Sequence, residues 1–411
     1  MPTLLKENKT QLNATRTSIA DVPVSTFEGK RVLIRVDYNV PIIDGKIIDD
    51  ERIVKSIPTL RYLIDAKAKI IIVSHLGRPK LKDPEFSLQL ISKKLNDLLE
   101  IPIQFVSESI MESSIAQERS KNLSNGDILL LENIRYYEEE TKNGDNLAIS
   151  LSKLCDYFVQ DAFGCVHRAH SSTSGITKYV PSFSGLLVDK ELSVLGGLME
   201  TAEKPFISII GGSKVSSKIQ ILDKLLTKVD TLMIGGGMSF TFLKALGYSI
   251  GLSVYEETYL DKALELIEYA KVNNKKIILP VDVVVADKFS NDAIKKTVKI
   301  DAIPDDMMGL DIGDVSTAMM ANEIQNAKTV LWNGPMGVYE FSEFANGTNG
   351  IAHAMAECEG QTVIGGGDVV SACKQSGYID KITYCSTGGG ASLEFIQGKP
   401  LPGIEALSQS N

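Results

Sequence analysis

The feature of this sequence that most constrains its fold is the alternation of short, continuously apolar, β-rich runs with amphipathic helical segments. Strands buried on both faces of a parallel sheet are typically apolar throughout, without polar residues at every second position. Between the runs, apolar residues in Leu88–Leu99, Ile219–Val229 and Leu260–Ile267 recur at spacings of three and four, which predicts helices. The alternation therefore predicts an α/β fold with parallel sheets. The expected strands are Val32–Val36, Ile70–Val73, Ile128–Leu131, Tyr157–Val159, Phe206–Ile210, Thr231–Ile234, Ile277–Leu279, Val330–Trp332, Thr362–Ile364 and Ile382–Tyr384.

The number of strands and the length of the chain together predict two domains. So many strands exceed the usual size of one doubly wound sheet, and 411 residues exceed the usual size of one core. We expect two doubly wound, Rossmann-like domains, an N-terminal one over 1–187 and a C-terminal one over 204–395. The intervening stretch 188–203 lacks a strand signal and is expected to be a helical hinge. Residues 1–25 are polar and without clear periodicity, so we expect a loosely held extension.

Composition and charge exclude several classes of protein. The chain has 43 Lys and Arg against 52 Asp and Glu, a formal net charge of −9, which argues against a broad basic face for nucleic acid. Its longest apolar runs are far shorter than a membrane span, and Met1–Thr10 has no continuous apolar stretch of a secretory signal. Five cysteines without Cys-x-x-Cys spacing indicate reduced thiols. We expect a cytoplasmic protein that binds neither nucleic acid nor membranes.

The segments that follow the strands of the first half are polar and rich in arginine. Ligands of open α/β sheets bind beyond the carboxyl ends of the strands, so these segments indicate the site. A single arginine there would be explained by a surface ion pair. A set of them at successive strand ends of an acidic protein instead predicts a pocket for phosphate or carboxylate, because guanidinium groups pair with both in a bidentate manner. The segments are Arg35–Asn39, Ser74–Pro79, Glu132–Arg135 and Asp161–His170, with Arg52 at an expected helix start.

Glycines follow the strands of the second half. Glycine lets the backbone approach a ligand and direct its N–H groups at phosphate oxygens. One glycine pair is explained by a tight turn, whereas five such segments at the same topological place predict a phosphate cradle. Lys214 and Lys218 are placed to meet phosphate charge, Asp368 to contact Mg²⁺, and a helix from Ser392 would direct its positive end at the same anion. The segments are Gly211–Lys218, Gly235–Gly237, Asn333–Glu340, Gly365–Asp368 and Ser386–Ser392.

Three other kinds of site are weighed and not favoured. The chain has no Gly-x-x-x-x-Gly-Lys-Ser/Thr segment of a Walker-type NTPase, and no Gly-x-Gly-x-x-Gly follows a strand as in dinucleotide-binding folds. The spacing Cys165-x-His167-x-x-His170 offers three metal ligands but no clear fourth, and Arg168 within it would repel a cation. Phosphoryl transfer between two bound substrates explains both half-sites, since it needs positioning and charge neutralisation rather than a covalent nucleophile.

The strand-end segments also resemble a known family. In order from about Phe27 to the C-terminus, they are similar to those of phosphoglycerate kinases. The segments that carry the resemblance are Arg35–Pro41, Ser74–Pro79, Leu131–Arg135, Asp161–His170, Gly211–Lys214, Leu279–Asp282, Trp332–Pro335, Gly365–Asp368 and Ser386–Gly390.

The resemblance implies an activity and a set of roles. The family transfers the acyl phosphate of 1,3-bisphosphoglycerate to ADP, reversibly and with Mg²⁺, giving 3-phosphoglycerate and ATP. Its members are usually monomers of two doubly wound lobes, whose C-terminal tail, here about 396–411, returns to the first lobe. The phosphoglycerate would be held by Arg35, Asp37, Asn39, Arg52, His75, Arg78, Arg135 and Arg168. The nucleotide would contact Gly212, Ser213, Lys214, Lys218, Gly235, Gly236, Asn333, Glu340, Gly367, Asp368 and Val369, with Asp368 on the Mg²⁺. Arg52, Lys214, Gly389 and Gly390 would act on the transferred phosphoryl group.

Two departures from the family pattern keep alternatives open. Val369 stands where the family commonly has Thr or Ser, which would remove a hydroxyl near the phosphates and a hydrogen bond of about 0.5–1.5 kcal/mol. Ser213 replaces a usual Ala. A catalytically weakened scaffold is therefore one alternative. The others are a two-lobed protein that binds small anions, which would not explain the asymmetry of the half-sites, and an NAD-dependent dehydrogenase, which lacks its fingerprint.

Overall fold

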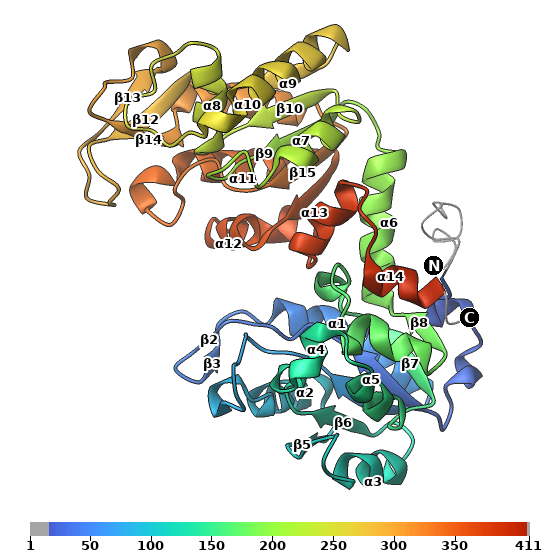
Figure 1. Ribbon diagram of the computed structural model, residues 1–411. Helices are drawn as coiled ribbons and strands as arrows, with labels where there is room; N and C mark the ends of the chain where they lie inside the picture. The colour runs from blue at the N-terminus through green and yellow to red at the C-terminus, as the bar shows by residue number, and fades with distance from the viewer. Residues whose placement is uncertain (1–15, 409–411) are drawn as a thin grey trace. The chain divides into compact units, whose positions relative to one another are not determined.

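The computed structural model describes residues 16–408, which form two compact units (Figure 1). The first unit runs up to Gly197 and includes the chain from Lys399 onward, whereas the second comprises Leu198–Gly398. The boundary between them falls inside helix α6 (Leu186–Glu200), within the stretch where we expect the hinge.

The first unit is built on a parallel sheet of six strands in the order β5-β6-β4-β1-β7-β8. Strands β6, β4, β1 and β7 are therefore consecutive neighbours, and the segments after them meet at one edge of the sheet. The strands are β1 (Arg31–Arg35), β4 (Lys69–Val73), β5 (Ile103–Val106), β6 (Ile128–Leu131), β7 (Tyr157–Gln160) and β8 (Ser182–Ser184).

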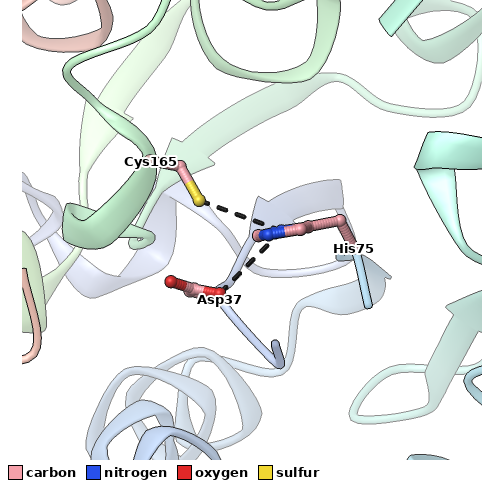
Figure 2. A group of neighbouring side chains, drawn as sticks. All are labelled: Asp37, His75 and Cys165. Atoms are coloured by element: carbon pink, nitrogen blue, oxygen red, sulfur yellow. Dashed lines mark hydrogen bonds and ion pairs between the residues drawn. The ribbon is translucent and has the colours of Figure 1, made fainter. Parts of the chain in front are cut away.

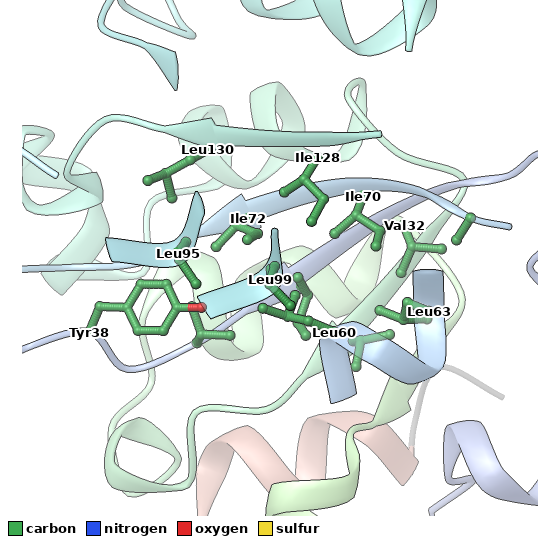
Figure 3. Close-up of a cluster of buried hydrophobic side chains, with 14 of the residues drawn as sticks. Val32, Tyr38, Leu60, Leu63, Ile70, Ile72, Leu95, Leu99, Ile128 and Leu130 are labelled. Carbon is green, nitrogen blue, oxygen red and sulfur yellow. The ribbon is translucent and has the colours of Figure 1, made fainter. Parts of the chain in front are cut away.

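Helices cover both faces of this sheet. On one face, Ile70 and Ile72 of β4 pack with Leu60 of α1 and Leu95 of α2 (Figure 3). The intervening residues of the strands, such as Ile71, pack into a second core on the opposite face. This two-sided burial explains why the strands are apolar throughout. The helices of the unit are α1 (Glu51–Asp65), α2 (Gln89–Leu99), α3 (Ile115–Asn122), α4 (Glu138–Lys142), α5 (Asp145–Ser152), most of α6, and α14 (Pro402–Ser408).

The second unit repeats this architecture with the strand order β11-β10-β9-β15-β16-β17, again all parallel. The α/β fold with two parallel sheets predicted from the sequence is therefore confirmed. The strands are β9 (Phe206–Ile210), β10 (Thr231–Ile234), β11 (Lys276–Ile278), β15 (Thr329–Asn333), β16 (Gln361–Gly365) and β17 (Tyr384–Cys385). The helices are α7 (Ile219–Leu226), α8 (Met238–Ala245), α9 (Leu260–Val272), α10 (Asp314–Gln325), α11 (Asn346–Glu357), α12 (Gly367–Gln375) and α13 (Gly390–Ile396).

Several strands were not predicted. The second unit carries an additional antiparallel sheet, β13-β12-β14, formed by β12 (Asp282–Ala286), β13 (Lys295–Lys299) and β14 (Met308–Ile312). Its edge strand β13 has the sequence Lys-Lys-Thr-Val-Lys and is largely exposed, so it lacks an apolar run. In the first unit, β5 and the serine-containing β8 lie at the sheet edges, and β2 (Ile42–Ile43) and β3 (Lys46–Ile47) form a short hairpin.

The loosely held extension predicted over residues 1–25 is wrong for the part that the structure describes. Ile19 is fully buried in the core of the first unit. Arg16 forms a 2.8 Å ion pair with Asp189 of α6, and Ser18 bridges to Ser184 of β8. The polar composition of this segment thus reflects specific pairing with α6 and β8. The first fifteen residues lie outside the described part of the chain.

The C-terminal residues pack on the first unit. Leu407 of α14 is fully buried in the core that also contains Ile71, and the backbone N–H of Gly403 donates to the carbonyl oxygen of Val166 at 2.8 Å. Over residues 16–408, no helix has the length and apolarity needed to cross a membrane.

Asp161 connects the end of β7 to the start of α6. Its Oδ1 accepts hydrogen bonds from the backbone N–H groups of Leu187 (2.9 Å) and Val188 (3.4 Å), and its carboxyl is fully buried. Burial raises the pKa of Asp161 to about 8, and the charge of Asp189 adds to this effect. The uncharged carboxyl is therefore the form that the fold favours.

This raised pKa predicts a pH-dependent stability. The contribution of Asp161 to the free energy of unfolding is complete below pH 4 and is lost as the pH rises toward 8. Asp161→Asn retains an acceptor oxygen but cannot ionise. Between pH 5 and pH 8.5 we expect the wild type to lose about 4 kcal/mol relative to this variant, measured by urea unfolding. Asp97→Asn, at an exposed position of α2, is the control, and its difference from the wild type in the free energy of unfolding should stay constant over this pH range. A constant difference between Asp161→Asn and the wild type would contradict the prediction.

Candidate functional sites

The first candidate site lies where β1, β4, β6 and β7 end. Asp37 and Asn39 follow β1, and their backbone and side chains are fixed by Arg52 from the first turn of α1. The guanidinium of Arg52 donates to Asp37 Oδ2 and to the carbonyl oxygen of Asn39, both at 3.0 Å. The amide oxygen of Asn39 accepts from the N–H of Gly77 at 2.8 Å, which joins this loop to the one after β4. The strand ends thus form one connected polar surface.

Positive charge dominates this surface. Burial lowers the pKa of Arg135, and the nearby charges of Arg35 and Arg168 lower it further. Burial also holds the pKa of His75 well below its usual range, together with the charges of Arg35, Arg135 and Arg52. Cations crowded in this way are stabilised when an anion joins them. The surface is therefore suited to a phosphate or carboxylate.

The predicted arginines differ in their exposure. Arg78 and Arg168 are exposed and free to approach a ligand, whereas Arg135 is half-buried and donates to the carbonyl oxygen of Gly77 at 2.5 Å. Arg35 has no exposed surface. Its guanidinium contacts groups of the chain itself, so the direct ligand contact expected for Arg35 is not available in this structure. Arg35 lies behind the surface that the other residues form.

Asp37, His75 and Cys165 lie close enough together to be tested as a metal site (Figure 2). His75 Nδ1 is 3.8 Å from Asp37 Oδ1 and 3.9 Å from Cys165 Sγ. Arg35 and Arg52 already donate to Nδ1 and to Asp37, and burial raises the pKa of the Cys165 thiol to about 12. These residues do not fit a divalent cation, because metal binding requires the thiolate and displacement of two arginines. Within the described chain, Cys165 groups with these two residues rather than with His167 and His170.

The second candidate site lies at the ends of β9, β10, β15, β16 and β17, all neighbours in the second sheet. Its glycines serve two different purposes. A Cβ atom at Gly211, Gly235 or Gly236 would collide with the neighbouring loops, so these glycines allow the loops to pack together. A Cβ at Gly212 or Gly389 would meet nothing within 4 Å, although both have positive φ angles. The open glycines are the ones that a ligand can approach.

Lys218 and Asn333 form the polar centre of this site. Lys218 Nζ donates to Asn333 Oδ1, and the amide of Asn333 donates to the carbonyl oxygen of Gly365 at 2.7 Å. Burial lowers the pKa of Lys218 to about 8, against the opposing charge of Asp368. Lys214, Asp368 and the other predicted polar residues, Ser213 and Glu340, are exposed.

A pocket of about 520 Å³ adjoins the glycines. Gly212, Gly236 and Asp368 lie on its border, and Glu340 also lines it. Its walls are mostly apolar, which suits a flat aromatic ring. The apolar lining includes Phe240, Leu252, Val254, Val283, Met308, Leu310, Val338 and Phe341.

Sequence reasoning missed the wall of this pocket. Val283, Met308 and Leu310 come from β12 and β14 of the unpredicted antiparallel sheet. Asp311, also of β14, lines the same pocket and accepts backbone N–H groups of Gly347 and Ile312 at 2.8 and 2.9 Å. Burial raises the pKa of Asp311 to about 7. The segment Leu279–Asp282, which enters β12, was the available signal in the sequence.

Val369 does not serve as the predicted ligand contact through its side chain. It is fully buried and packs in the hydrophobic core of the second unit with Ile364 and Cys373. In this structure the side chain at position 369 lies in the core. A hydroxyl there, as the family commonly has, would therefore not face the ligand. Gly367 and Asp368, which precede it at the start of α12, are exposed.

Comparison with known proteins identifies the chain's relatives. The family model of phosphoglycerate kinase matches residues 19–399. A phosphoglycerate kinase of Clostridium tetani is 49% identical over 393 residues, covering 95% of this chain and 97% of that protein. A cytosolic phosphoglycerate kinase of Triticum aestivum is 49% identical over 402 residues, covering 97% and 100%. The solved structure of phosphoglycerate kinase from Coxiella burnetii has a TM-score of 0.86 at 40% identity, covering 96% of this chain and 99% of that one.

Two parallel α/β units, one with an arginine-rich surface and one with a glycine-bordered pocket, are typical of a phosphotransferase that uses two substrates. The matches agree with this class over nearly the whole chain. The chain belongs to the phosphoglycerate kinase family. The kinase class predicted from the sequence is confirmed.

The burial of Val369 gives a prediction for its reversion. Val369→Thr should lower the free energy of unfolding by about 1–3 kcal/mol, because it places a hydroxyl in an apolar core. Urea unfolding of the variant measures this loss. Val315→Thr, at an exposed position of α10, is the matched control and should change stability little. An unchanged stability of Val369→Thr would mean that the core supplies a partner for the hydroxyl.

Proposed function

We propose that the chain catalyses the reversible transfer of a phosphoryl group between the carboxyl oxygen of a phosphoglycerate and ADP. The forward reaction converts 1,3-bisphosphoglycerate and ADP into 3-phosphoglycerate and ATP. The observation that carries this proposal is the chemical difference between the two sites. An arginine-rich surface suits a small substrate with two anionic groups, and an apolar pocket bordered by open glycines suits a nucleotide.

In the first unit, phosphoglycerate would contact Asp37, Asn39, Arg52, His75, Arg78, Arg135 and Arg168. The exposed guanidinium groups of Arg78 and Arg168 supply paired donors to phosphate oxygens. Arg52 is fixed by Asp37 and by the Asn39 carbonyl, so it is oriented before the substrate arrives. Such pre-orientation lowers the entropy that binding costs.

In the second unit, the base and ribose would occupy the apolar pocket, with Glu340 near the ribose. The phosphates would lie over Gly212 and the start of α12, near Lys214 and Lys218. The first backbone N–H groups of a helix have no partners within the helix and suit an anion. The remaining proposed contacts are Ser213, Gly235, Gly236, Asn333 and Gly367.

Asp368 is the residue that would hold Mg²⁺ bound to the nucleotide. It is exposed at the start of α12 and borders the pocket. A single carboxylate combined with nucleotide phosphates and water is a common Mg²⁺ environment, so the residues present fit the ion. When bound, Mg²⁺ would neutralise negative charge on the phosphates.

The proposed chemistry needs no general base. In the ATP-consuming direction the nucleophile is the carboxylate of 3-phosphoglycerate, which is already deprotonated at neutral pH. Arg52 and Lys214 would neutralise charge on the phosphoryl group during transfer, and the backbone of Gly389 and Gly390 would bind its oxygens. The stretch 188–203 stays our predicted hinge between the units.

We also propose that the protein acts in the cytoplasm as a monomer on small-molecule substrates. A relative from Triticum aestivum named as cytosolic supports the location. The net charge of −9 is consistent with a protein that does not bind nucleic acid.

The direct test is the release of ADP from MgATP by the purified protein, with and without 3-phosphoglycerate. We expect strong release only when both substrates are present. Release without phosphoglycerate would indicate an ATPase and contradict the proposed exclusion of water. Absence of release, with both ligands still binding, would favour the scaffold alternative.

The two sites predict different kinetic effects. Lys214→Ala should lower kcat by about a hundredfold, because it removes charge from the transferring group. Arg78→Ala should raise the KM for 3-phosphoglycerate by about tenfold with little change in kcat. Steady-state kinetics in both substrates measure these effects. Lys271→Ala and Arg119→Ala, exposed positions on α9 and α3, are the matched controls. The reverse pattern would overturn the two roles.

A further inference from the structure

A buried ion pair lies behind the arginine-rich surface of the first unit. Arg35 of β1 and Glu140 of α4 are both fully buried, and their charged atoms are 3.9 Å apart. Ser172 links them more closely. Its hydroxyl accepts from Arg35 Nε at 2.9 Å and donates to Glu140 Oε1 at 2.6 Å, while its backbone N–H donates to Glu140 Oε2 at 3.0 Å.

Arg35 also contacts His75. One of its terminal nitrogens lies 3.1 Å from His75 Nδ1. A guanidinium has only donors, so Nδ1 must be the unprotonated, accepting nitrogen of a neutral imidazole. The proton of the ring is then on Nε2. Every hydrogen bond that the described residues make with this ring is at Nδ1, which leaves the Nε2–H group for another acceptor.

The charges around the ring support this state. His75 faces Arg35, Asp37 and the Cys165 thiol, and Arg52, Arg135 and His170 contribute further positive charge. Burial and these charges hold the pKa of His75 well below its usual range. Asp37 Oδ1 is 3.8 Å from Nδ1, beyond hydrogen-bond distance, and its other oxygen is bound by Arg52.

Glu140 keeps its charge in spite of its burial. Burial alone would raise the pKa of Glu140, but His170, Arg35 and Ser172 together lower it below its ordinary value. The carboxylate is therefore a permanent counter-charge for Arg35. Without it, Arg35 would be an uncompensated buried cation.

We propose that Glu140 is a positioning residue which, through Ser172 and Arg35, fixes His75 as a neutral donor with its proton on Nε2. The Nε2–H group then donates a hydrogen bond to an anionic oxygen of the phosphoglycerate. The part that concerns the substrate rests on the proposed function, whereas the tautomer of His75 does not. His75 thus contributes a hydrogen-bond donor of fixed orientation, and no positive charge, to a surface that already holds several cations.

The tautomer is tested first, on the wild-type protein without substrate. Long-range ¹H–¹⁵N correlation spectra of histidine-labelled protein distinguish the two neutral tautomers and the imidazolium. The chain has 4 histidines, and a His75→Gln spectrum assigns the signal. We expect His75 to carry its proton on Nε2 at pH 7. A proton on Nδ1, or on both nitrogens, would overturn the proposal whatever the activity of the enzyme.

The role of Glu140 is tested by Glu140→Gln, which keeps the shape but removes the charge. We expect the KM for 3-phosphoglycerate to rise by about tenfold, as for the loss of one hydrogen bond, with kcat and the KM for ATP little changed. The His75 signal should lose its single-tautomer pattern. Glu138→Gln, at an exposed position of the same helix, is the matched control and should leave both readouts unchanged.

Ser172→Ala provides a second variant should Glu140→Gln fail to fold. It removes the hydroxyl that joins Arg35 to Glu140 and should cause the same two changes to a smaller extent. An unchanged His75 spectrum in the folded variants would overturn the role of Glu140. A wild-type enzyme that shows the expected tautomer but never responds to 3-phosphoglycerate would instead overturn the proposed function.

Discussion

The burial of both faces of each parallel sheet is the constraint on which the rest of the structure depends. Ile70 and Ile72 of β4 pack into one core, and Ile71 between them packs into another. Strands that are apolar on both sides offer no room for polar chemistry along their length. Functional side chains are therefore confined to the loops at the strand ends, where parallel strands gather them at one edge.

The same constraint determines how the arginine-rich surface must be supported. Residues at the edge stand directly above a dry core, so the last strand residue, Arg35, is a fully buried cation. Its charge requires a partner at the same depth, and Glu140 supplies it through Ser172. The residues that contact a ligand and the buried residues that orient those side chains thus come from neighbouring parts of the same strand ends.

The sequence was sufficient to predict the strands of both parallel sheets that are continuously apolar, together with the edge at which polar residues gather. It was not sufficient for elements that lack a continuous apolar run. Strand β13 is rich in lysine, and β8 is mostly serine, so neither has an apolar run. The antiparallel sheet was missed although β12 contains the apolar run Val283–Ala286, and with it the apolar wall that Met308 and Leu310 give to the pocket.

Which of the predicted site residues are accessible depends on packing that no motif encodes. Arg35 and Arg78 are equally polar in the sequence, yet one is fully buried and the other exposed. Val369 follows an exposed Asp368 by one residue and packs into the core, because the first turn of α12 rotates successive side chains by about 100°. A functional segment read from a sequence therefore combines residues that contact a ligand with residues that hold them. The three-dimensional structure separates the two groups, since only contacts and burial distinguish a ligand-binding arginine from one that positions a neighbouring histidine.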